Sequence, residues 1–451
     1  MKGRFPKKLL IILFWLLLWY LLALLVDNTF LLVTPYRAAV ALGSSMSTLV
    51  FWKTVLFSVL RIGAGFLGGT LVATLLGWLS FRIRFLEEML SPLIMLLKAI
   101  PVASFAVLLL IWWGSSYLAV AVCFLVVMPN LYINTLEGLK NTDIKLAEMA
   151  EVFHIPVRNR FFYIYRPALK PFLVSALKLS LGMSWKSGVA AEIIGTPAFS
   201  VGERLYLSKI YLDTAGVFAW TAVVILLSWC FERSVLWMAE RFFAWEPACE
   251  SVGTNVGRKT AKPGEAQQDA ENRAVLYCRQ LSKSYGELGL YQDFDNAYEL
   301  GQIYYLKSPS GSGKTTFFRM LCGLEKPDRG VIEPKLRYSY MFQEDRLCEE
   351  YSALRNVELV LGRQTGKDNT GNAGEEALRS LLPEEALYKP CCQLSGGMKR
   401  RVSLVRAMEA DSDCVLLDEP FTGMDAETRE QAEAYIKNRQ KGRIVMIATH
   451  I

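Results

Sequence analysis

The sequence predicts a polytopic α-helical membrane domain of about six helices in residues 1–245, followed by a soluble α/β domain in residues 274–451. All 11 Trp lie in the first stretch, which holds 22 Lys and Arg against 12 Asp and Glu, whereas the rest of the chain holds 28 against 31. Hydrophobic residues make up 52% of the chain. These values exclude a secreted, fibrous or disordered chain and argue against a wholly soluble protein.

The basic excess of the first half is explained by membrane orientation, because Lys and Arg gather at the cytoplasmic ends of membrane helices. It therefore gives no reason to expect a nucleic-acid partner. The nine Cys are scattered without a framework and predict reduced thiols, and we attribute the adjacent pair Cys391-Cys392 to chance rather than to a redox role. With His154 and His450 as the two histidines of the sequence, a multi-histidine metal site is excluded.

A first membrane helix is predicted at Leu9–Val26, an uncharged run of 18 residues that would be about 27 Å long. Basic residues precede it, as in a secretory signal peptide, but no small-residue cleavage site follows. We therefore expect an uncleaved helix with its N-terminus inside the cell, with a cleaved signal peptide as the alternative.

Long apolar runs predict the further spans, which cover residues 54–80, 90–112, 117–137, 172–195 and 215–240. The second span is rich in Gly, which suits close helix packing, and the third is interrupted by Pro101. Because six is an even number of crossings, a chain that starts in the cytoplasm also ends there. The basic loop 138–171 and the soluble half then both lie in the cytoplasm.

The fifth predicted span contains ionisable residues, Lys186 and Glu192, which are costly in a membrane unless they are paired or face a wet cavity. Either they line a substrate path, or they lie near the outer interface with their polar ends in water. Lys178 is nearer the cytoplasmic end, and we expect its ammonium group to reach the interface there.

The loop 140–171 is too polar to cross a membrane, yet its apolar residues recur at helical spacing. Periodicity alone is typical of an ordinary connecting helix. The run Glu148-Met149-Ala150, with His154 and Pro167 after it, resembles the E-A-A loop of binding-protein-dependent ABC importer permeases of the sulfonate, nitrate and taurine branch. This resemblance runs from about residue 54 to residue 240 and implies a type I importer permease.

The same resemblance implies that this helix docks into a groove of an ATPase. The residues that would couple the two are Glu148, Ala150, His154 and Pro167. Because His154 stands where the family usually has Gly, a different geometry is expected in the turn after the docking helix.

Residues 246–273 are the predicted linker, since these 28 residues include almost no large apolar side chain and cannot bury a core. After the linker, short β-rich runs alternate with polar helical patterns, as in an α/β nucleotide-binding domain. The predicted strands cover residues 274–278, 303–306, 338–342, 414–417 and 444–448.

A glycine-rich loop follows the strand 303–306 and opens a helix, in which Gly residues let backbone N–H groups wrap a phosphate. Lys314 would meet the β- and γ-phosphates of ATP, and the Thr315 hydroxyl would hold Mg²⁺. Ser308 stands where the pattern has Gly, and a positive φ there would cost on the order of 1 kcal/mol. The predicted phosphate-binding residues are Ser308, Ser310, Gly311, Ser312, Gly313, Lys314, Thr315 and Thr316.

The apolar strand 414–417 ends in two carboxylates, of which Asp418 would hold Mg²⁺ and Glu419 would polarise the attacking water. The peptide 394–398, Leu-Ser-Gly-Gly-Met, ends 21 residues before Glu419 and resembles the signature of ABC ATPases, with Met398 in place of the usual Gln. This resemblance implies further roles. Tyr285 would stack on adenine, Gln343 would sense Mg²⁺, and Asp425 would be the D-loop residue. The signature residues would be Ser395, Gly396 and Gly397, and the switch residue would be His450.

Two features differ from a standard ABC cassette. Lys314 and Ser395 are separated by 81 residues, which predicts a trimmed helical subdomain. The chain also stops one residue after His450, at Ile451, where the family has Asp. We therefore expect the terminal strand to lack part of its cover, with marginal stability or help from a partner.

Together the two resemblances imply a permease and an ATPase fused in one half-transporter, which would import a small, anionic or organic solute by ATP hydrolysis. Two chains, or one chain and a second half-transporter, would sandwich each ATP between Lys314, Thr315 and Asp418 of one chain and Ser395 and Gly397 of the other. An extracytoplasmic solute-binding protein would deliver the solute. The permease would lie in the bacterial cell membrane, with the ATPase in the cytoplasm.

Two alternatives to an importer are considered. An exporter or lipid transporter would need long helices that extend into the cytoplasm, which the short loops do not provide. A membrane regulator that binds nucleotide without hydrolysis is suggested by Ser308 and the short C-terminus, but it is opposed by the presence of Lys314, Asp418, Glu419 and His450.

Overall fold

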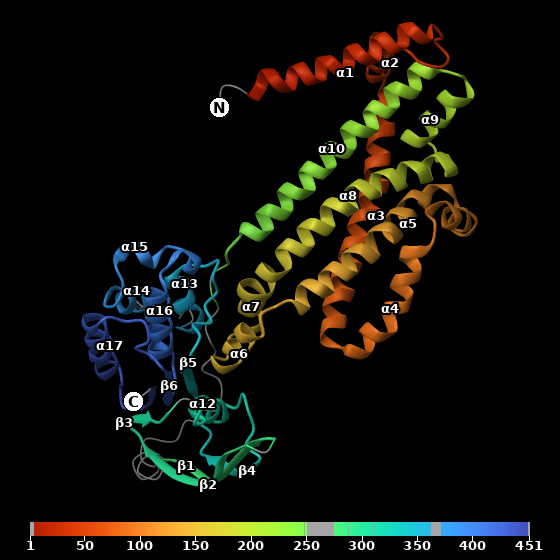
Figure 1. Cartoon of the computed structure of the whole chain (residues 1–451). Coiled ribbons are helices and arrows are strands. Elements are labelled where there is room, and N and C mark those ends of the chain that lie inside the picture. The colour runs from red at the N-terminus through yellow and green to blue at the C-terminus, as the bar shows by residue number, and fades with distance from the viewer. Residues whose placement is uncertain are drawn as a thin grey trace, which may run out of the picture. The chain divides into compact units, whose positions relative to one another are not determined.

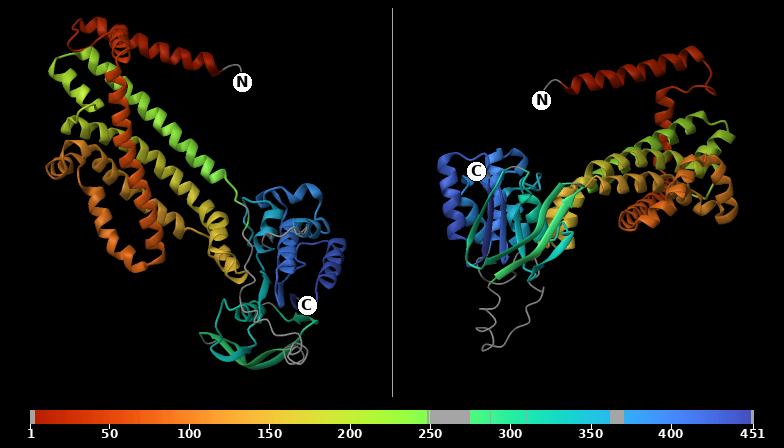
Figure 2. Two further views of the ribbon diagram at one scale, coloured as in Figure 1. Left: turned by 180° about the vertical axis from the view of Figure 1, so that it is seen from behind. Right: turned by 60° about the horizontal axis from the view of Figure 1, so that its bottom comes forward.

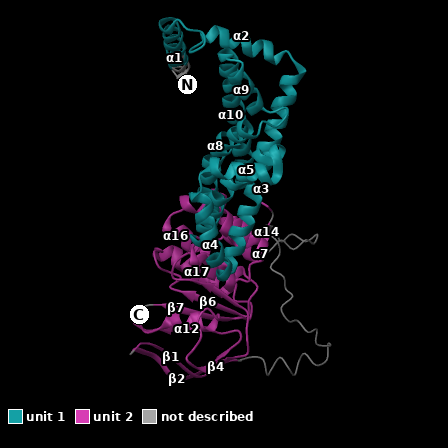
Figure 3. Cartoon of the chain, turned by 90° about the vertical axis from the view of Figure 1, so that its right-hand side faces the viewer, with its two compact units in different colours: residues 1–141, 168–245 teal, residues 142–167, 246–451 magenta. Residues whose placement is uncertain are grey.

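The computed structural model describes residues 4–247, 249, 275–286, 288–309, 311–361 and 371–449. It divides the chain into two compact units, each built from two stretches of sequence (Figure 3). Unit 1 comprises Met1–Asn141 and Ala168–Trp245, and unit 2 comprises Thr142–Pro167 and Glu246–Ile451. Most of the predicted linker lies outside the described residues.

The described part of unit 1 is helical. Its helices are α1 (Arg4–Val26), α2 (Pro35–Met46), α3 (Leu49–Arg82), α4 (Arg84–Ala99), α5 (Val102–Lys140), α8 (Arg166–Gly195), α9 (Val201–Ile210) and α10 (Thr214–Ala244) (Figure 1). Among the described residues, four helical stretches are long and apolar enough to cross a membrane: Leu9–Val26, Leu49–Arg82, Val102–Lys140 and Thr214–Ala244. The α8 helix, which contains the predicted span 172–195, is not one of these four.

The first predicted span forms α1, and its apolar side chains stay largely exposed, since 6% of the window Leu9–Val26 is buried. The indole N–H of Trp19 donates to the Val33 carbonyl at 3.0 Å, and the Trp19 ring stacks on Phe218. Most of α1 lies to one side of the other helices of unit 1 (Figure 2). An apolar surface of this length requires lipid or a partner to cover it.

The predicted third span, 90–112, is wrong, because the chain breaks there into two helices. The first of them, α4, ends at Ala99 and is about 24 Å long, too short to cross a hydrocarbon core. Ile100 adopts an extended conformation (φ −72°, ψ 128°), as expected for a residue that precedes proline. The second helix, α5, contains a further non-helical residue at Gly114 (φ 73°, ψ 176°).

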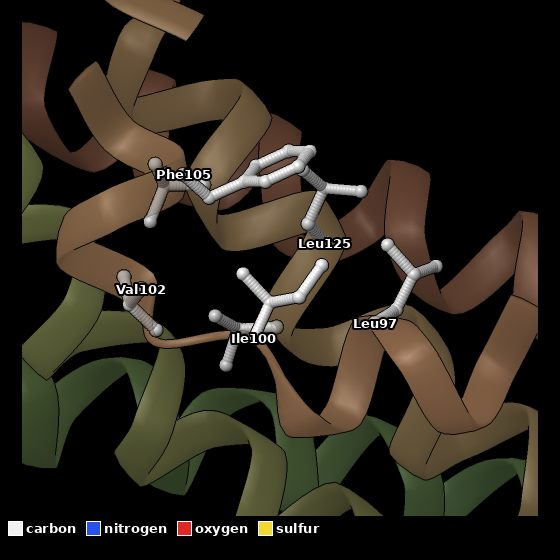
Figure 4. A pocket seen from close by; sticks show the side chains of 7 residues that line it. Leu97, Ile100, Val102, Phe105 and Leu125 are labelled. Carbon is white, nitrogen blue, oxygen red and sulfur yellow. The ribbon is translucent and has the colours of Figure 1, made fainter. Parts of the chain in front are cut away.

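The break leaves an apolar pocket between the end of α4 and the two parts of α5 (Figure 4). Aliphatic and aromatic side chains line it: Leu97, Ile100, Val102, Phe105, Val122, Leu125 and Val126. The extended residue Ile100 directs its side chain into the opening (Figure 4).

Close packing in unit 1 joins α3 to α5, as the glycine-rich sequence of the second span suggested. A Cβ atom at Gly65 would lie 2.4 Å from the Val120 carbonyl oxygen, and one at Gly77 would lie 2.9 Å from the Thr135 Cβ atom. Contacts this short leave room for glycine alone, so the two backbones approach each other more closely than larger side chains would permit.

Glu192 is fully buried in unit 1, at 0% exposure, and therefore does not reach an aqueous interface by extending its side chain. Its carboxylate accepts hydrogen bonds from the Ser58 hydroxyl at 2.8 Å and from the Gly202 amide at 3.1 Å. The carboxylate thus lies at the N-terminus of α9, where it satisfies a free amide, and joins α3, α8 and α9. Lys186, in contrast, is exposed on the surface of this unit.

Unit 2 contains two sheets. The antiparallel sheet has the order β2-β1-β4, with β1 at Val275–Tyr285, β2 at Leu288–Glu299 and β4 at Arg329–Glu333. The parallel sheet has the order β3-β7-β6-β5, with β3 at Ile303–Lys307, β5 at Tyr338–Met341, β6 at Cys414–Asp418 and β7 at Ile444–Thr449. The five strands predicted from the sequence are all present.

The described part of unit 2 also contains helices, two of which are short segments of other helical type. They are α6 (Ile144–Val152), α7 (Val157–Arg160), the π-helix η1 (Phe161–Tyr165), α12 (Lys314–Leu321), α13 (Ala353–Leu361), α14 (Gly371–Arg379), α15 (Glu384–Leu387), the 3₁₀-helix η2 (Cys391–Gln393), α16 (Gly396–Glu409) and α17 (Ala426–Asn438). The Val and Leu side chains of β6 are buried on both faces, as expected for a central parallel strand.

The terminal strand β7 pairs with β3 on one side and β6 on the other, and five of its six residues are buried. The expected loss of cover at this strand is therefore not observed. Because all four strands of this sheet are parallel, their carboxyl ends meet at one edge. Ligands of open α/β sheets bind at this edge, and the predicted phosphate loop and Asp418-Glu419 both follow strands that end there.

Candidate functional site

The phosphate loop, residues 308–316, connects β3 to α12 with backbone geometry suited to an anion. Gly311 has φ 81° and Gly313 has φ 90°, values that glycine adopts at little cost. Gly313 is the N-cap of α12, so the first backbone amides of this helix point towards the loop. Ser310, a predicted phosphate-binding residue, lies outside the described residues.

Lys314 places its ammonium group inside the loop. The Nζ atom donates to the Ser308 carbonyl and, at 3.1 Å, to the Pro309 carbonyl, while the side chain is largely buried. An ammonium group held by two carbonyls has a further N–H available for an anion, since lysine carries three donors. The charge is therefore positioned where the β- and γ-phosphates of a bound nucleotide were predicted.

Ser308 does not adopt the conformation that the glycine pattern suggested. Among the described residues, it is not one of the non-glycine residues with positive φ, so the expected cost of that conformation does not arise. Its hydroxyl lies 2.6 Å from the Ser312 hydroxyl and forms a hydrogen bond across the loop. The serine thus closes the loop through its side chain.

Thr315 and Asp418 meet at the carboxyl edge of the sheet. The Thr315 hydroxyl donates to Asp418 Oδ2 at 2.8 Å, and the Tyr340 hydroxyl donates to the same oxygen at 3.1 Å. Burial raises the pKa of Asp418 above its usual value, while the two hydroxyl donors oppose that rise. A hydroxyl oxygen beside a carboxylate is the kind of hard oxygen ligand set that Mg²⁺ prefers, so these residues fit the predicted metal.

Glu419 follows Asp418 with φ 50°, a left-handed conformation that is strained for a side chain of this size. Its backbone amide donates to the Ala448 carbonyl at 2.9 Å, which fixes the turn against β7. The Glu419 side chain is partly exposed, and its Oε2 atom accepts from the Thr422 hydroxyl at 3.4 Å. Strain of this kind is found at functional sites, where it aims a side chain at a reacting group.

Gln343 and Tyr285 lie at exposed positions in unit 2. Gln343 follows β5 by two residues, at the same sheet edge as Asp418. Tyr285 ends β1 with 49% of its surface exposed, and the Lys283 ammonium group lies 5.3 Å from its ring centre. The Tyr285 hydroxyl donates to Glu325, which follows the phosphate-loop helix α12. His450, the predicted switch residue, lies outside the described residues.

The signature peptide forms the N-terminus of α16. Ser395 is the N-cap, and its hydroxyl accepts from the Met398 amide at 3.3 Å. Ser395 and Gly396 are exposed, and a Cβ atom at Gly396 would meet nothing within 4 Å. Gly397 lies against the Gly423 carbonyl, with 3.2 Å to a Cβ atom built on it. The free end of α16 is thus open to an anion from outside this chain. Asp425 caps α17 by accepting from the Thr428 amide at 2.8 Å.

Arg400 is a site residue that the sequence did not reveal. Its buried guanidinium donates to the carbonyls of Phe342 and Gln343 at 2.8 and 2.9 Å, and to the carbonyls of Asp418 and Glu419, the latter at 2.8 Å. One side chain of the signature helix therefore holds the ends of β5 and β6 together. The signal in the sequence was the basic run Lys399-Arg400-Arg401, which a solvated helix face also explains.

Residues 142–167 belong to unit 2 together with residues 246–451, and we name them the docking segment after their predicted role. Its helix α6 is capped by Asp143, whose carboxylate accepts from the Lys145 amide at 2.8 Å. Met149 and Ala150 are fully buried, and Phe153 is 5% exposed. They belong to the same buried cluster as residues of α12 and of the sheet, such as Phe318 and Tyr340.

Glu148 lies between two arginines of the same unit. Its Oε1 atom accepts from Arg319 Nη2 at 2.9 Å, and its Oε2 atom accepts from Arg346 Nη1 at 2.6 Å. Arg319 belongs to the phosphate-loop helix α12, whereas Arg346 follows Gln343 by three residues. The hydrogen bond from Arg319 holds the pKa of Glu148 below its usual value, and Arg346 adds to this effect.

His154 takes the left-handed conformation, with φ 49°, that glycine would adopt most easily. The Ile155 amide donates to the Ala150 carbonyl at 2.9 Å, which closes the C-terminus of α6 in the usual way. The expected change in geometry is therefore not observed, although a side chain in this conformation costs on the order of 1 kcal/mol. Arg160 adds a second cap, since it donates to the carbonyls of Ala150 and Ile155.

The second half of the docking segment is also bound within unit 2, which the sequence did not predict. Arg166 is 2% exposed and donates to the Tyr351 hydroxyl at 3.1 Å. That hydroxyl in turn donates to the Phe162 carbonyl at 3.1 Å. Pro167 is the second residue of α8 and lies partly buried beside this contact.

Two family models match the chain, one in each of its two halves. The model of the ABC transporter family matches residues 291–422, and that of the binding-protein-dependent transport system inner membrane component matches residues 65–243. A taurine import ATP-binding protein of Pseudomonas aeruginosa is 33% identical over 41% of this chain and 68% of its own length. The chain belongs to the ABC transporter family.

Two further relatives match a similar share of this ABC transporter chain. An aliphatic sulfonates import ATP-binding protein of Paraburkholderia xenovorans is 35% identical, over 43% of this chain. A Nod factor export ATP-binding protein I of Cupriavidus pinatubonensis is 31% identical, over 39% of this chain. The chain spans 59% of the length of each of these two relatives.

Within this ABC transporter chain, the structure brings together five of the predicted site residues, namely Ser308 with Ser312 and Lys314, and Thr315 with Asp418. Ser395 makes its described hydrogen bond within α16 rather than to the phosphate loop. The arrangement offers a phosphate-binding loop, a hard-oxygen ligand pair and a carboxylate, Glu419, at one edge of the sheet. It also links this edge to the docking segment through Arg319 and Arg346.

Proposed function

We propose that the chain is a fused permease–ATPase half-transporter that imports a small anionic or organic solute of sulfonate or taurine type, driven by ATP hydrolysis. Its permease would cover residues 1–245, its linker 246–273 and its ATPase 274–451. The observation that carries the proposal is the position of Glu148 between Arg319 of the phosphate-loop helix and Arg346 of the segment after Gln343. One carboxylate of the permease sequence thereby contacts both elements that would respond to nucleotide.

In the proposed ATPase site, the amides of the loop and Lys314 bind the β- and γ-phosphates. Thr315 and Asp418 supply oxygen ligands for Mg²⁺, which when bound would offset the negative charge of the phosphates. Glu419 orients and polarises the attacking water. As the family resemblance implies, Gln343 senses Mg²⁺ and contacts the membrane domain, while His450 contacts the γ-phosphate. Arg400 holds the backbone carbonyls of Gln343 and Glu419 in fixed positions.

Two copies of the chain, or one chain and a second half-transporter, would form the complete machine. The signature residues Ser395 and Gly396 are exposed at the N-terminus of α16, so they can bind the phosphates of a nucleotide held by another chain. Binding of ATP to the closed pair would then supply the free energy that shifts the transporter between its two states. Hydrolysis at Glu419 would release that closed state.

In the proposed cycle the docking segment transmits closure to the permease. Because Arg319 is part of the helix that begins at the phosphate loop, a shift of that helix moves its partner Glu148 directly. Buried residues of α6 make this contact stiff. The complete assembly would take its solute from an extracytoplasmic binding protein and would lie in the bacterial cell membrane, with the ATPase in the cytoplasm.

Export is the second candidate, because one relative carries the name of a Nod factor export ATP-binding protein. The sulfonate and taurine import names of the other two relatives, and the match to an import-type permease model, favour import. Purified chain reconstituted into vesicles, with a solute-binding protein and solute supplied on one side at a time, separates these directions. Uptake that requires the binding protein supports import, whereas ATP-driven efflux without it contradicts the proposal.

The hydrolytic role is tested by Glu419→Gln in the same vesicles. We expect MgATP to bind as before while turnover falls at least about 100-fold, a loss of roughly 2.7 kcal/mol of transition-state stabilisation. Glu427→Gln, an exposed acid on α17, is the matched control and should keep wild-type turnover. Equal turnover in wild type and Glu419→Gln would remove the role given to Glu419, and nucleotide binding without any turnover in wild type would favour the regulator.

A further inference from the structure

Three side-chain contacts hold the first residues of the second stretch of unit 2, which begins at Glu246. The Tyr163 hydroxyl donates to the Pro247 carbonyl. Arg355 Nη2 lies 3.8 Å from Glu246 Oε2, and Arg355 Nη1 lies 3.8 Å from Cys249 Sγ. Tyr163 belongs to the docking segment, whereas Arg355 belongs to the ATPase helix α13. Glu246, Pro247 and Cys249 therefore contact both the docking segment and the ATPase.

Cys249 is buried as deeply as a core residue, with 4% of its surface exposed. It belongs to the apolar cluster that also contains Phe153 of the docking segment and Cys348 and Tyr351 of the ATPase. Burial raises the pKa of the Cys249 thiol. A residue in a stretch of polar linker sequence that is buried to this degree is anchored, because a free tether would leave it in water.

The surface that receives these residues is built from paired aromatic and basic side chains. The rings of Tyr163 and Tyr351 pack edge to face with centroids 4.9 Å apart, and the Arg355 guanidinium lies 5.9 Å from the Tyr163 ring centre. Glu358 fixes the Arg355 guanidinium through a bond of 2.8 Å. Each side chain that contacts Glu246, Pro247 or Cys249 is thus held in place by a neighbour within unit 2.

We propose that Glu246, Pro247 and Cys249 form a docking strap, which seats between Tyr163 and Arg355 and holds the docking segment on the ATPase of its own chain. A strap of this kind makes docking intramolecular, so that the local concentration of ATPase at the docking segment is set by the chain and not by encounter with other copies. The role of the strap in coupling rests on the proposed function of the docking segment. The seating of the strap does not, because it is measured without nucleotide turnover.

The native thiols test the seating. In the purified full chain, brief labelling with a maleimide, followed by mass spectrometry of each cysteine, should modify Cys249 at least about 10-fold more slowly than the exposed Cys392. Arg355→Ala should speed the labelling of Cys249 at least about 10-fold and leave Cys392 unchanged. Loss of the nearby positive charge alone would raise the thiol pKa further and slow the reaction, so an increase reports exposure.

Two further variants keep this test independent of a folding defect. Tyr163→Phe removes the donor to the Pro247 carbonyl but keeps the aromatic ring, and it should also speed the labelling of Cys249. Arg379→Ala removes an exposed arginine that pairs with Glu375 and Glu384, and it serves as the matched control without effect. If wild-type Cys249 reacts as fast as Cys392, or if both strap variants leave its rate unchanged, the strap does not exist.

A photo-crosslink decides whether the strap seats on its own chain. The photoreactive amino acid p-benzoylphenylalanine at position 246 keeps Tyr163, Arg355 and Cys249, and it places the reactive group where the Glu246 side chain approaches Arg355. Irradiation should give a product with the mass of one chain, and tryptic peptides that join residue 246 to the segment around Arg355. A product with the mass of two chains would mean that the strap seats on a neighbouring copy and would overturn the proposal. Because neither result depends on Glu419 or on solute, the strap proposal and the transport proposal can each be contradicted while the other stands.

Discussion

At the scale of single residues, the site depends on charges that are shared between elements. Glu148 is paired with arginines from two different parts of unit 2, and its side chain is 23% exposed. Asp418 likewise accepts from Thr315 of α12 and from Tyr340 of β5. Residues placed in this way do more than bind a ligand, because they also fix the distance between the elements that carry them.

Replacing Glu148 with Gln should separate ATP hydrolysis from solute movement. The change keeps the shape of the side chain but removes the charge that Arg319 and Arg346 share, so that Arg319 keeps its pair with Glu325 at 3.5 Å while Arg346 loses the carboxylate it binds. We expect transport in vesicles to fall at least about 10-fold while turnover by the ATPase persists. Glu151→Gln, an exposed position on the same helix, is the control. Transport and turnover that fall together would contradict a purely coupling role for Glu148.

The same pair has a defined dependence on pH. Because the folded-state pKa of Glu148 is lowered, its contribution to docking is present above the usual pKa of a glutamate, 4.5, and is lost as the pH falls through the lower folded value. Lowering the pH from 8 to 5 should therefore leave the docked state intact. Cys249 labelling compared with that of Cys392 at each pH, with both rates corrected for reagent reactivity, measures this. A loss of protection between pH 8 and pH 5 would contradict it.

At the scale of elements, α16 connects the signature peptide to the rest of unit 2. Its first residue follows the exposed Ser395, Arg400 binds the ends of two sheet strands, and Arg406 donates to the backbone carbonyls of Asp345 and Arg346. Arg406 also lies over the Phe153 ring, 5.4 Å from its centre. A single helix thus contacts the docking segment at one end and presents the signature at the other.

Substitution of Arg400 tests this view of α16. Arg400→Ala would remove a donor from four backbone carbonyls at the ends of β5 and β6, of which that of Glu419 keeps the Thr422 amide at 3.3 Å. A buried group left unsatisfied costs about 1–3 kcal/mol. We expect a lower unfolding temperature and a turnover reduced at least about 10-fold. The control is Lys399→Ala, at the residue before Arg400, which removes an ion pair with Glu349. It should change the unfolding temperature and the turnover much less. If both variants behave alike, Arg400 does not organise the site.

The elements also show which features a sequence can predict. The phosphate loop, the signature and the five apolar strands are local patterns, because each depends on residues that are neighbours in the chain. Strands β2 and β4 were missed because they mix apolar with polar and glycine residues and are mostly exposed, so neither forms an apolar run. Arg346, Arg400 and Tyr163 act through partners about 20 to 200 residues away, and no spacing reveals them. Pro101 marks the break between α4 and α5, but a proline alone does not tell whether the chain kinks within one helix or divides into two.

At the scale of the whole molecule, the proposed function requires two chains that share each nucleotide. Ser310→Cys with Ser395→Cys, in a Cys392→Ser background that removes the exposed neighbouring thiol, should give a product with the mass of two chains when MgATP is trapped by Glu419→Gln. Without nucleotide the yield should fall several-fold. A product with the mass of one chain, or a material that stays monomeric with MgATP, would contradict the shared site.

The division of the chain into units has a consequence for anyone who wishes to study the ATPase by itself. Residues 142–167 lie within unit 2 although unit 1 flanks them on both sides in the sequence, so the polypeptide passes between the units three times. A recombinant fragment that starts at residue 246 would lack Met149, Ala150 and Phe153, and the apolar groove beneath them would face water. A synthetic peptide of residues 142–167 should restore that fragment, which would make the missing piece of the fold a reagent that can be added and titrated.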